Sequence, residues 1–203
     1  MSQLSQRSAR ISRSTGETTI EAELCLDGGP RKIQAPDGFF RHMLDALTTH
    51  GGLGLDLNAV GDVDVDLHHT VEDVGIVLGE ALVASLGDRR GVVRFAHAYA
   101  PLDEALARAV IDLSGRGFFV YNVPAELEHT WVTRDFPLTL VADFFQAFAD
   151  RGRFTLHLDV LRARNGHHAA EAAFKAAALA LRGAVALRGG EQAVPSTKGT
   201  LTA

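Results

Sequence analysis

Two hydrophobic periods alternate along the chain, and the same order of periods occurs twice. A stretch with helical spacing of apolar residues at 39–51 is followed by strict alternation of apolar and polar residues over 53–57. The second half repeats this order, with helical spacing at 141–152 and alternation over 154–158. Both helical stretches end at a glycine, which is typical of a helix C-terminus. Each half is therefore predicted to contain a helix followed by a strand.

Each half also contains a second helical pattern and an earlier strand. The helical patterns run through 74–82 and 172–179, and strand-like residues that end in turns lie at 20–28 and 109–115. The order strand–helix–strand–helix thus occurs twice, which indicates an internal repeat. We predict an α+β fold with an internal duplication, in which helices cover one face of each sheet.

The repeat sets the expected domain organisation. We expect a flexible N-terminal tail over 1–12, a first half over 13–95, a second half over 96–190 and a C-terminal tail over 191–203. No linker rich in proline and serine separates the halves, so they are predicted to form one compact unit.

The composition is that of an ordinary globular protein and excludes several functional classes. Of the 203 residues, 46% are hydrophobic and 22% are charged, and the net charge is −5. This mild acidity argues against nucleic acid or an anionic membrane surface as the main partner. No run approaches the roughly 20 apolar residues of a membrane span, and the N-terminus lacks the apolar segment of a secretory signal, so we expect a cytoplasmic protein. The single cysteine, Cys25, excludes an internal disulfide and a cysteine zinc cluster.

A pair of adjacent histidines followed by a glutamate occurs twice, 99 residues apart. The two motifs are His68-His69-Thr70-Val71-Glu72 and His167-His168-Ala169-Ala170-Glu171. Residues four apart on a helix share a face, at about 5–6 Å between Cβ atoms, and imidazole with carboxylate suits Mn, Fe or Zn. One such motif alone is more often a surface ion pair worth a few tenths of a kcal/mol. Two copies at matching helix starts favour a site for two metal ions.

The repeat also pairs His42 with Asp143, each on the helix that precedes its double-histidine motif. Both residue types bind divalent metals. Each is therefore predicted to be an additional ligand.

Candidate anion-binding residues lie outside these motifs. Arg94 follows a turn at Gly91, Arg116 stands between two glycines, and Ser196 and Lys198 lie in a short segment bracketed by proline and glycine. Arginine binds phosphate with two parallel hydrogen bonds, and hydroxyl groups complete such a cradle. Each signal alone is weak, because solvated loop arginines and a disordered tail would give the same pattern. No glycine-rich nucleotide-binding motif is present.

These motifs together resemble the imidazoleglycerol-phosphate dehydratase family of histidine biosynthesis, from about residue 13 to residue 201. The segments that carry the resemblance are Glu17-Thr18-Thr19-Ile20, Phe40-Arg41-His42-Met43-Leu44, Asp66-Leu67-His68-His69-Thr70-Val71-Glu72-Asp73, Pro101-Leu102-Asp103-Glu104-Ala105, Asp112-Leu113-Ser114-Gly115-Arg116, Asn165-Gly166-His167-His168 and Pro195-Ser196-Thr197-Lys198-Gly199-Thr200-Leu201.

The resemblance implies a duplicated fold of the ribosomal protein S5 domain 2-like type and a homo-oligomer of 24 subunits built from trimers. It implies sites between subunits that each hold two Mn²⁺ ions. The implied ligands are His42, His68, His69, Glu72, His167, His168 and Glu171. The implied phosphate-binding residues are Arg94, Arg116, Ser196 and Lys198, and Glu17 is the implied acid/base carboxylate.

The implied reaction removes water from imidazole glycerol phosphate to give imidazole acetol phosphate. The hydrogen that leaves is on a carbon beside the ring and is not acidic. A ring held by metal as an imidazolate could expel the neighbouring hydroxyl once a base removes that proton. The metals would act as Lewis acids and as a template, and Glu17 would transfer the proton.

Three positions depart from the family pattern. Arg41 stands where aspartate is usual, Ala46 where glutamine is usual, and Asp143 where a metal-binding histidine is usual. We predict that Asp143 keeps the ligand role, with an altered metal preference, because the repeat makes it equivalent to His42.

Two other functions remain open at this point. The same ligands could serve a dinuclear metallohydrolase or phosphatase, or the chain could be a divergent, non-catalytic assembly protein that binds metal. Retention of Glu17, Arg94, Arg116 and Lys198 argues against the last, while Asp143 and Ala46 leave it open.

Overall fold

The computed structural model describes residues 7–188, 193–197, 199 and 201. The strands are β1 (Ser8–Ser14), β2 (Thr18–Cys25), β3 (Arg31–Gln34), β4 (Gly54–Gly61), β5 (Phe95–Leu102), β6 (Ala105–Asp112), β7 (Phe118–Asn122) and β8 (Thr155–Arg162). The helices are α1 (Gly38–Gly51), α2 (His68–Leu86), α3 (Thr139–Gly152) and α4 (Gly166–Val185). Each helix in this part of the chain is too short or too polar to cross a membrane.

The two halves have the same topology. The first sheet has the strand order β1-β2-β4-β3 and the second has β5-β6-β8-β7. In each, the first three strands of that order pair antiparallel and the last strand pairs parallel to its neighbour. The predicted duplicated α+β fold is confirmed.

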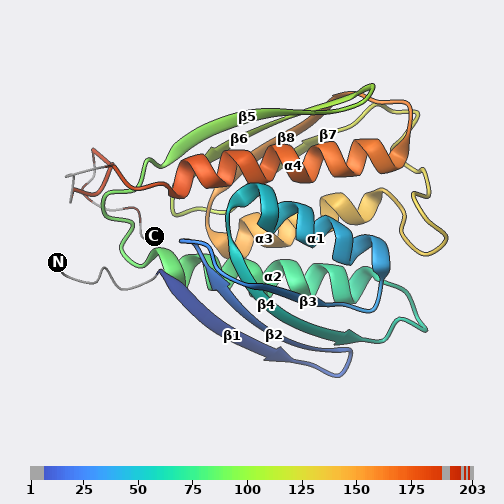
Figure 1. Cartoon of the computed structure of the whole chain (residues 1–203), viewed down its shortest axis with the longest axis horizontal. Coiled ribbons are helices and arrows are strands. Elements are labelled where there is room, and N and C mark those ends of the chain that lie inside the picture. The colour runs from blue at the N-terminus through green and yellow to red at the C-terminus, as the bar shows by residue number, and fades with distance from the viewer. Residues whose placement is uncertain (1–6, 189–192, 198, 200, 202–203) are drawn as a thin grey trace.

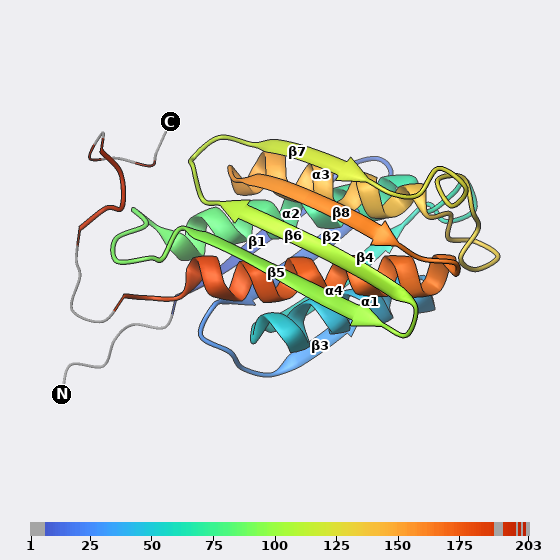
Figure 2. The same cartoon turned by 90° about the horizontal axis from the view of Figure 1, so that it is seen from above.

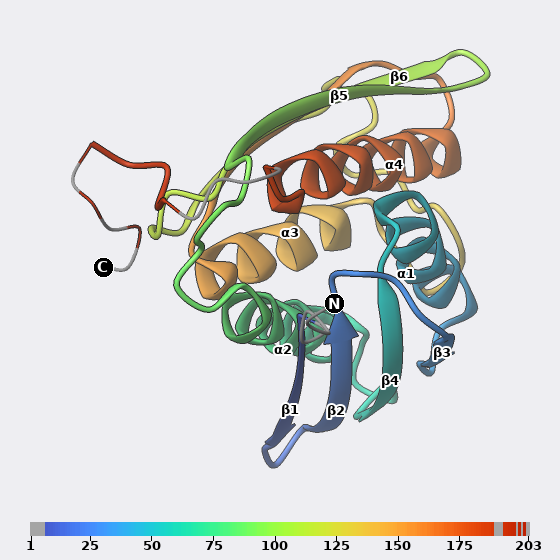
Figure 3. The same ribbon diagram turned by 60° about the vertical axis from the view of Figure 1, so that its left-hand side comes forward.

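The helices form an inner layer between the two sheets (Figures 1 and 2). α2 packs on β1 and β2, and α4 packs on β5 and β6. Across the layer, α2 packs on α3 and α1 packs on α4, so each half contributes one helix to each of these pairs (Figure 3). Each sheet is therefore covered by helices on one face, as predicted, and its other face is turned away from the helices.

Close approach of α2 to α3 depends on two glycines. A Cβ atom at Gly75 would lie 2.6 Å from the carbonyl oxygen of Phe144, and one at Gly79 would lie 2.7 Å from the backbone nitrogen of Gly152. Contacts this short do not occur with a side chain present, so the glycines allow the two helix backbones to approach. The depth to which α2 packs on α3 fixes where their N-terminal side chains meet.

The double-histidine motifs lie at the N-terminal ends of α2 and α4. Asn165 caps α4, because its side-chain oxygen accepts hydrogen bonds from the backbone nitrogens of His167 and His168. Asp66 accepts a hydrogen bond from the backbone nitrogen of His68 at 2.8 Å. Polar side chains of this kind satisfy the free N–H groups of a first helical turn, and here they also fix the direction in which both doublets leave their helices.

The expectation of a flexible tail over 1–12 is wrong for residues 8–12. These residues belong to β1, which pairs with β2 along its whole length, from Ser8 opposite Cys25 to Ser14 opposite Thr19. Ala9, Ile11 and Arg13 are half-buried while the residues between them are exposed. This alternation is that of a strand, but serine and arginine make it weak in the sequence, and α2 supplies the face that completes it.

Candidate functional site

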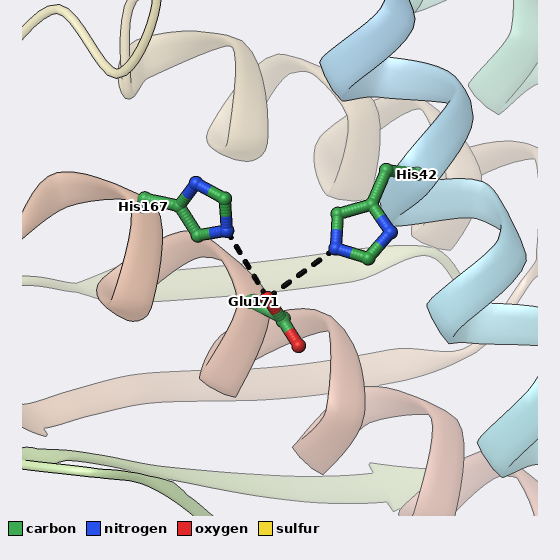
Figure 4. Close-up of side chains that lie close together, drawn as sticks. All are labelled: His42, His167 and Glu171. Atoms are coloured by element: carbon green, nitrogen blue, oxygen red, sulfur yellow. Dashed lines mark hydrogen bonds and ion pairs between the residues drawn. The ribbon is translucent and has the colours of Figure 1, made fainter.

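A cluster of three side chains lies where α1 meets the N-terminal part of α4 (Figure 4). Nε2 of His42 lies 3.4 Å from Oε2 of Glu171, and Nε2 of His167 lies 3.2 Å from the same oxygen. One ligand atom from each of the three lies within 4.8 Å of the others. Two imidazole nitrogens and one carboxylate oxygen that converge in this way form a donor set for a divalent ion.

Lys175 keeps the Glu171 carboxylate ionised. Its Nζ lies 2.6 Å from Oε1 of Glu171, one turn further along α4, so that Oε2 faces the two histidines. Burial by itself raises the pKa of the Glu171 carboxyl, but the hydrogen bond and charge of Lys175, with a smaller contribution from His42, bring that pKa below its ordinary value. A carboxyl group must be deprotonated to bind a metal ion, and Glu171 meets this condition.

The repeat places a related pair where α2 meets α3. Asp143 occupies on α3 the position that His42 occupies on α1, and Nδ1 of His68 lies 3.3 Å from Oδ2 of Asp143. Glu72 is exposed. Over the described residues, the cluster of His42 is the only one in which three such side chains converge. The structure thus brings Asp143 next to His68, whereas within the described residues of one chain Glu72 does not complete a second cluster.

A cavity of about 650 Å³ opens beside His68 and Asp143. Its lining also includes Asp64, Asp66 and Trp131, and the Trp131 side chain is largely exposed. A cavity of this size can hold a small polar ligand. The sequence did not predict it, because its lining comes from three separate stretches of the chain, within 36–37, 63–68 and 131–143.

The second histidine of each doublet has different partners from the first. Nδ1 of His69 lies 3.0 Å from Oδ2 of Asp62 and 3.8 Å from Oε2 of Glu17. Nδ1 of His168 lies 2.8 Å from Oε2 of Glu104. Successive residues of a helix point about 100° apart. The first imidazole of each doublet therefore faces a neighbouring helix, and the second faces the adjoining loops, which carry Asp62 and Glu17 in one half and Glu104 in the other.

These carboxylates orient the second histidines. The hydrogen bond to Asp62 raises the pKa of His69, and the hydrogen bond to Glu104 raises the pKa of His168. The same contact lowers the pKa of Glu104 to about 2. A carboxylate on Nδ1 fixes the tautomer and leaves Nε2 available, which is the usual arrangement for a histidine that binds metal.

Glu17 and Glu104 occupy equivalent positions, immediately before β2 and β6, but their environments differ. Glu104 contacts His168 directly. In the first half Asp62 makes the corresponding contact with His69. Glu17 lies further from the same nitrogen, at 3.8 Å, and 56% of its side chain is exposed. Asp62 therefore orients His69 in the first half, as Glu104 orients His168 in the second.

The candidate anion-binding residue Arg94 is already bound within the chain. Its Nε and Nη2 donate to the carboxylate of Asp112 at 2.7 and 3.2 Å, and its Nη1 donates to the carbonyl oxygen of Pro195 at 2.7 Å. Arg94 thereby holds the segment that contains Ser196, which is half-buried. Arg116 lies exposed in the turn after β6, and Lys198 lies outside the described residues.

These anion-binding candidates lie far from the histidines. The backbone nitrogen of Arg94 donates to the carbonyl oxygen of Ala184, near the C-terminal end of α4, whereas His167 is at its N-terminal end. At 1.5 Å per residue, this separation along α4 is about 25 Å. Figure 1 shows the same separation, with residues 193–197 on one side of the helices and the loops that lead into α2 and α4 on the other.

Comparison with known proteins identifies the family. The family model described as imidazoleglycerol-phosphate dehydratase matches residues 36–181. A protein of this name from Acidiphilium cryptum (strain JF-5) is 53% identical over 197 residues, which cover 96% of this chain and 99% of the relative. The chain belongs to the imidazoleglycerol-phosphate dehydratase family. Another family member, from Lacticaseibacillus casei (strain BL23), is 50% identical over 196 residues, covering 96% of this chain and 100% of the relative.

Solved structures of the family share the fold. The crystal structure of imidazoleglycerol-phosphate dehydratase from Staphylococcus aureus subsp. aureus N315 superposes with a TM-score of 0.79 at 36% identity, covering 89% of this chain and 99% of that one. The structure of the enzyme from Pyrococcus furiosus in complex with (S)-C348 gives a TM-score of 0.81 at 34% identity, covering 94% and 99%. The family likeness thus extends over nearly the whole chain.

Sequence reasoning missed Asp62 and Glu104 as partners of the histidines. Glu104 could have been found, because the repeat makes it the equivalent of Glu17. Asp62 carries no such signal, since only the fold brings the end of β4 next to α2. Arg41 is exposed and Ala46 is buried on α1, and nothing in the structure explains either departure from the family pattern.

Proposed function

We propose that this chain is a hydro-lyase that removes water from imidazole glycerol phosphate to give imidazole acetol phosphate, in cytoplasmic histidine biosynthesis. The observation that carries the proposal is the convergence of His42, His167 and Glu171, with Glu17 exposed 3.8 Å from His69 at the other doublet. Membership of the dehydratase family supports the assignment. It also disfavours the hydrolase and the non-catalytic assembly protein.

The donor set fits two Mn²⁺ ions. The proposed ligands are His42, His68, His69, Glu72, Asp143, His167, His168 and Glu171. Nitrogen and oxygen donors without thiolate suit Mn²⁺, Fe²⁺ or Zn²⁺, of which the family resemblance favours Mn²⁺. Asp62 and Glu104 contact Nδ1 of two of the histidines, which leaves their Nε2 atoms for the metal. When bound, such ions supply Lewis-acid polarisation of the ring of the substrate.

Glu17 is the proposed proton-transfer group. Its carboxylate is exposed at the hairpin turn and lies 3.8 Å from His69, so it borders the place where an imidazole ring would bind. A carboxylate that binds no metal and orients no histidine can accept the proton on carbon and return it to the departing hydroxyl. Glu171 cannot take this role, because Lys175 and the two histidines occupy both of its oxygens.

The separation of the two groups of residues supports sites shared between subunits. Arg94 lies about 25 Å along α4 from His167, which is too far for both to contact one small phosphorylated substrate. We propose a homo-oligomer of 24 subunits in which the phosphate binds to Arg94, Arg116, Ser196 and Lys198 of one chain. The histidines and Glu17 of a neighbouring chain would hold the imidazole end.

The proposed activity predicts a specific product. The protein loaded with Mn²⁺ and given imidazole glycerol phosphate is expected to form an enolisable ketone, measured by absorbance after treatment with alkali, without release of phosphate. Protein stripped with chelator is the control. Free phosphate as the product would instead identify a phosphatase, and the absence of both products would identify a non-catalytic assembly protein.

Shared sites predict complementation between two inactive variants. Chains with Glu17→Gln and chains with Arg116→Ala are each expected to be nearly inactive alone. Co-expressed in equal amounts, they form some sites that take Glu17 from one chain and Arg116 from another, so activity returns to about a quarter of the wild-type value for random assembly. Mixtures that stay as inactive as their components would show that each site is formed within one chain.

A further inference from the structure

Asp73 is a buried carboxylate that contacts two residues of the β1–β2 hairpin. Its side chain is 7% exposed. Nε of Arg13, on β1, donates to Oδ1 at 2.8 Å, and the hydroxyl of Thr18, on β2, donates to Oδ2 at 2.5 Å. A buried charge is costly to the folded state unless it is paired and hydrogen-bonded. Here both oxygens of the carboxylate have a partner on the hairpin.

The second half of the fold has no polar residues at the positions equivalent to Arg13, Thr18 and Asp73. Residues 13 and 100, and residues 18 and 105, are 87 positions apart and occupy the same register in their sheets, while residue 172 has the place on α4 that residue 73 has on α2. All three second-half positions are alanines, Ala100, Ala105 and Ala172, and all three are buried. The same packing of hairpin on helix therefore forms without any polar group.

The polar group of the first half lies directly beside Glu17. Thr18 follows Glu17 in the chain, and the hydroxyl of Thr15 accepts hydrogen bonds from the backbone nitrogens of both. On the other side, the carbonyl oxygen of Glu17 accepts a hydrogen bond from the backbone nitrogen of Asp62. The turn that carries Glu17 is thus tied to α2 by Asp73 and to the end of β4 by Asp62.

We propose that Asp73, with Arg13 and Thr18, is a positioning group that holds Glu17 beside His69. This inference rests on the proposed role of Glu17 in proton transfer. In the second half, the contact of Glu104 with His168 fixes the turn directly. In the first half Asp62 makes the closer contact with His69, at 3.0 Å, and Glu17 lies 3.8 Å from it. The position of Glu17 is therefore fixed through the hairpin and its contact with α2.

The test replaces the three polar residues by the alanines found at the equivalent positions of the second half. The variant Arg13→Ala/Thr18→Ala/Asp73→Ala gives the first half the three alanines of the second, which avoids leaving one buried partner unpaired. It is expected to assemble and to bind Mn²⁺ as the wild type does, measured by size and by electron paramagnetic resonance. Because a shift of about 1 Å in a reacting group can cost roughly 100-fold in rate, kcat should fall by about that factor while KM changes little. Hydrogen exchange should rise in the turn at residues 15–17 and not in α2.

Two further variants serve as controls for this experiment. Thr18→Ser retains the hydroxyl and should restore most of the rate lost in Thr18→Ala. Asp27→Asn breaks the Arg7–Asp27 pair, which ties the same hairpin at its opposite end, and should leave kcat unchanged. Wild-type kcat in the triple variant, or loss of Mn²⁺ binding together with activity, would overturn the inference. Full activity in Glu17→Gln would instead overturn the proposed role of Glu17, which separates the two failures.

Discussion

Replacing Glu17 by glutamine is expected to lower kcat by roughly 10²–10⁴-fold, the usual contribution of a general acid–base group. Glutamine has nearly the same shape, so the β1–β2 turn, the oligomer and the content of Mn²⁺ should be unchanged. Steady-state kinetics and metal analysis on the same preparation measure both effects. Turnover at the wild-type rate would remove Glu17 from the mechanism.

Glu104 supplies the control for this experiment, because it has the same position in the second half. Glu104→Gln removes the carboxylate that orients His168, and loss of such an orienting partner typically weakens metal binding by about 10–100-fold. The two glutamates should therefore differ in kind: Glu17→Gln affects the rate at full metal occupancy, and Glu104→Gln affects the affinity for Mn²⁺.

Replacing Glu171 by glutamine is expected to remove one Mn²⁺ per chain and to abolish turnover. The amide is neutral and cannot replace a carboxylate oxygen between His42 and His167, and the Lys175 ammonium loses its ion pair. Metal content after gel filtration and titration of Mn²⁺ by electron paramagnetic resonance give the stoichiometry. Retention of two ions per chain would show that Glu171 is not a ligand.

Asp143→Asn is the matched change on the other helix pair. If Asp143 binds the second ion with His68, this variant also loses one Mn²⁺ per chain, but the ion held by Glu171 remains. Anomalous diffraction from crystals loaded with Mn²⁺ locates the ions directly. An ion more than about 3 Å from the Asp143 carboxylate, beyond the range of a metal–oxygen bond, would contradict the ligand role.

Much of the architecture could be predicted because the same pattern occurs in both halves, so each half supports the interpretation of the other. The helical and alternating periods at 39–57 and 141–158 agree in order and spacing, and the structure has α1, β4, α3 and β8 there. The strand β1 was missed, since a run of serine and arginine has little apolar alternation until α2 covers one face of it. The double-histidine motifs could be placed at helix starts because both copies occur at the same point of the repeated pattern.

The sequence by itself determined that the fold is doubled and which side chains could bind metal, because residue type and local period are properties of the chain. Only the tertiary structure decided which imidazole meets which carboxylate. Packing of α1 on α4 brings Glu171 to His42 across 129 positions. The turn before β2 places Glu17 3.8 Å from His69, whereas Glu104 lies 2.8 Å from His168. Such contacts depend on the relative placement of distant elements, which no local pattern encodes. The same is true of the distance between Arg94 and His167, which is set by the length of α4 and supports the proposal that each site is shared between chains.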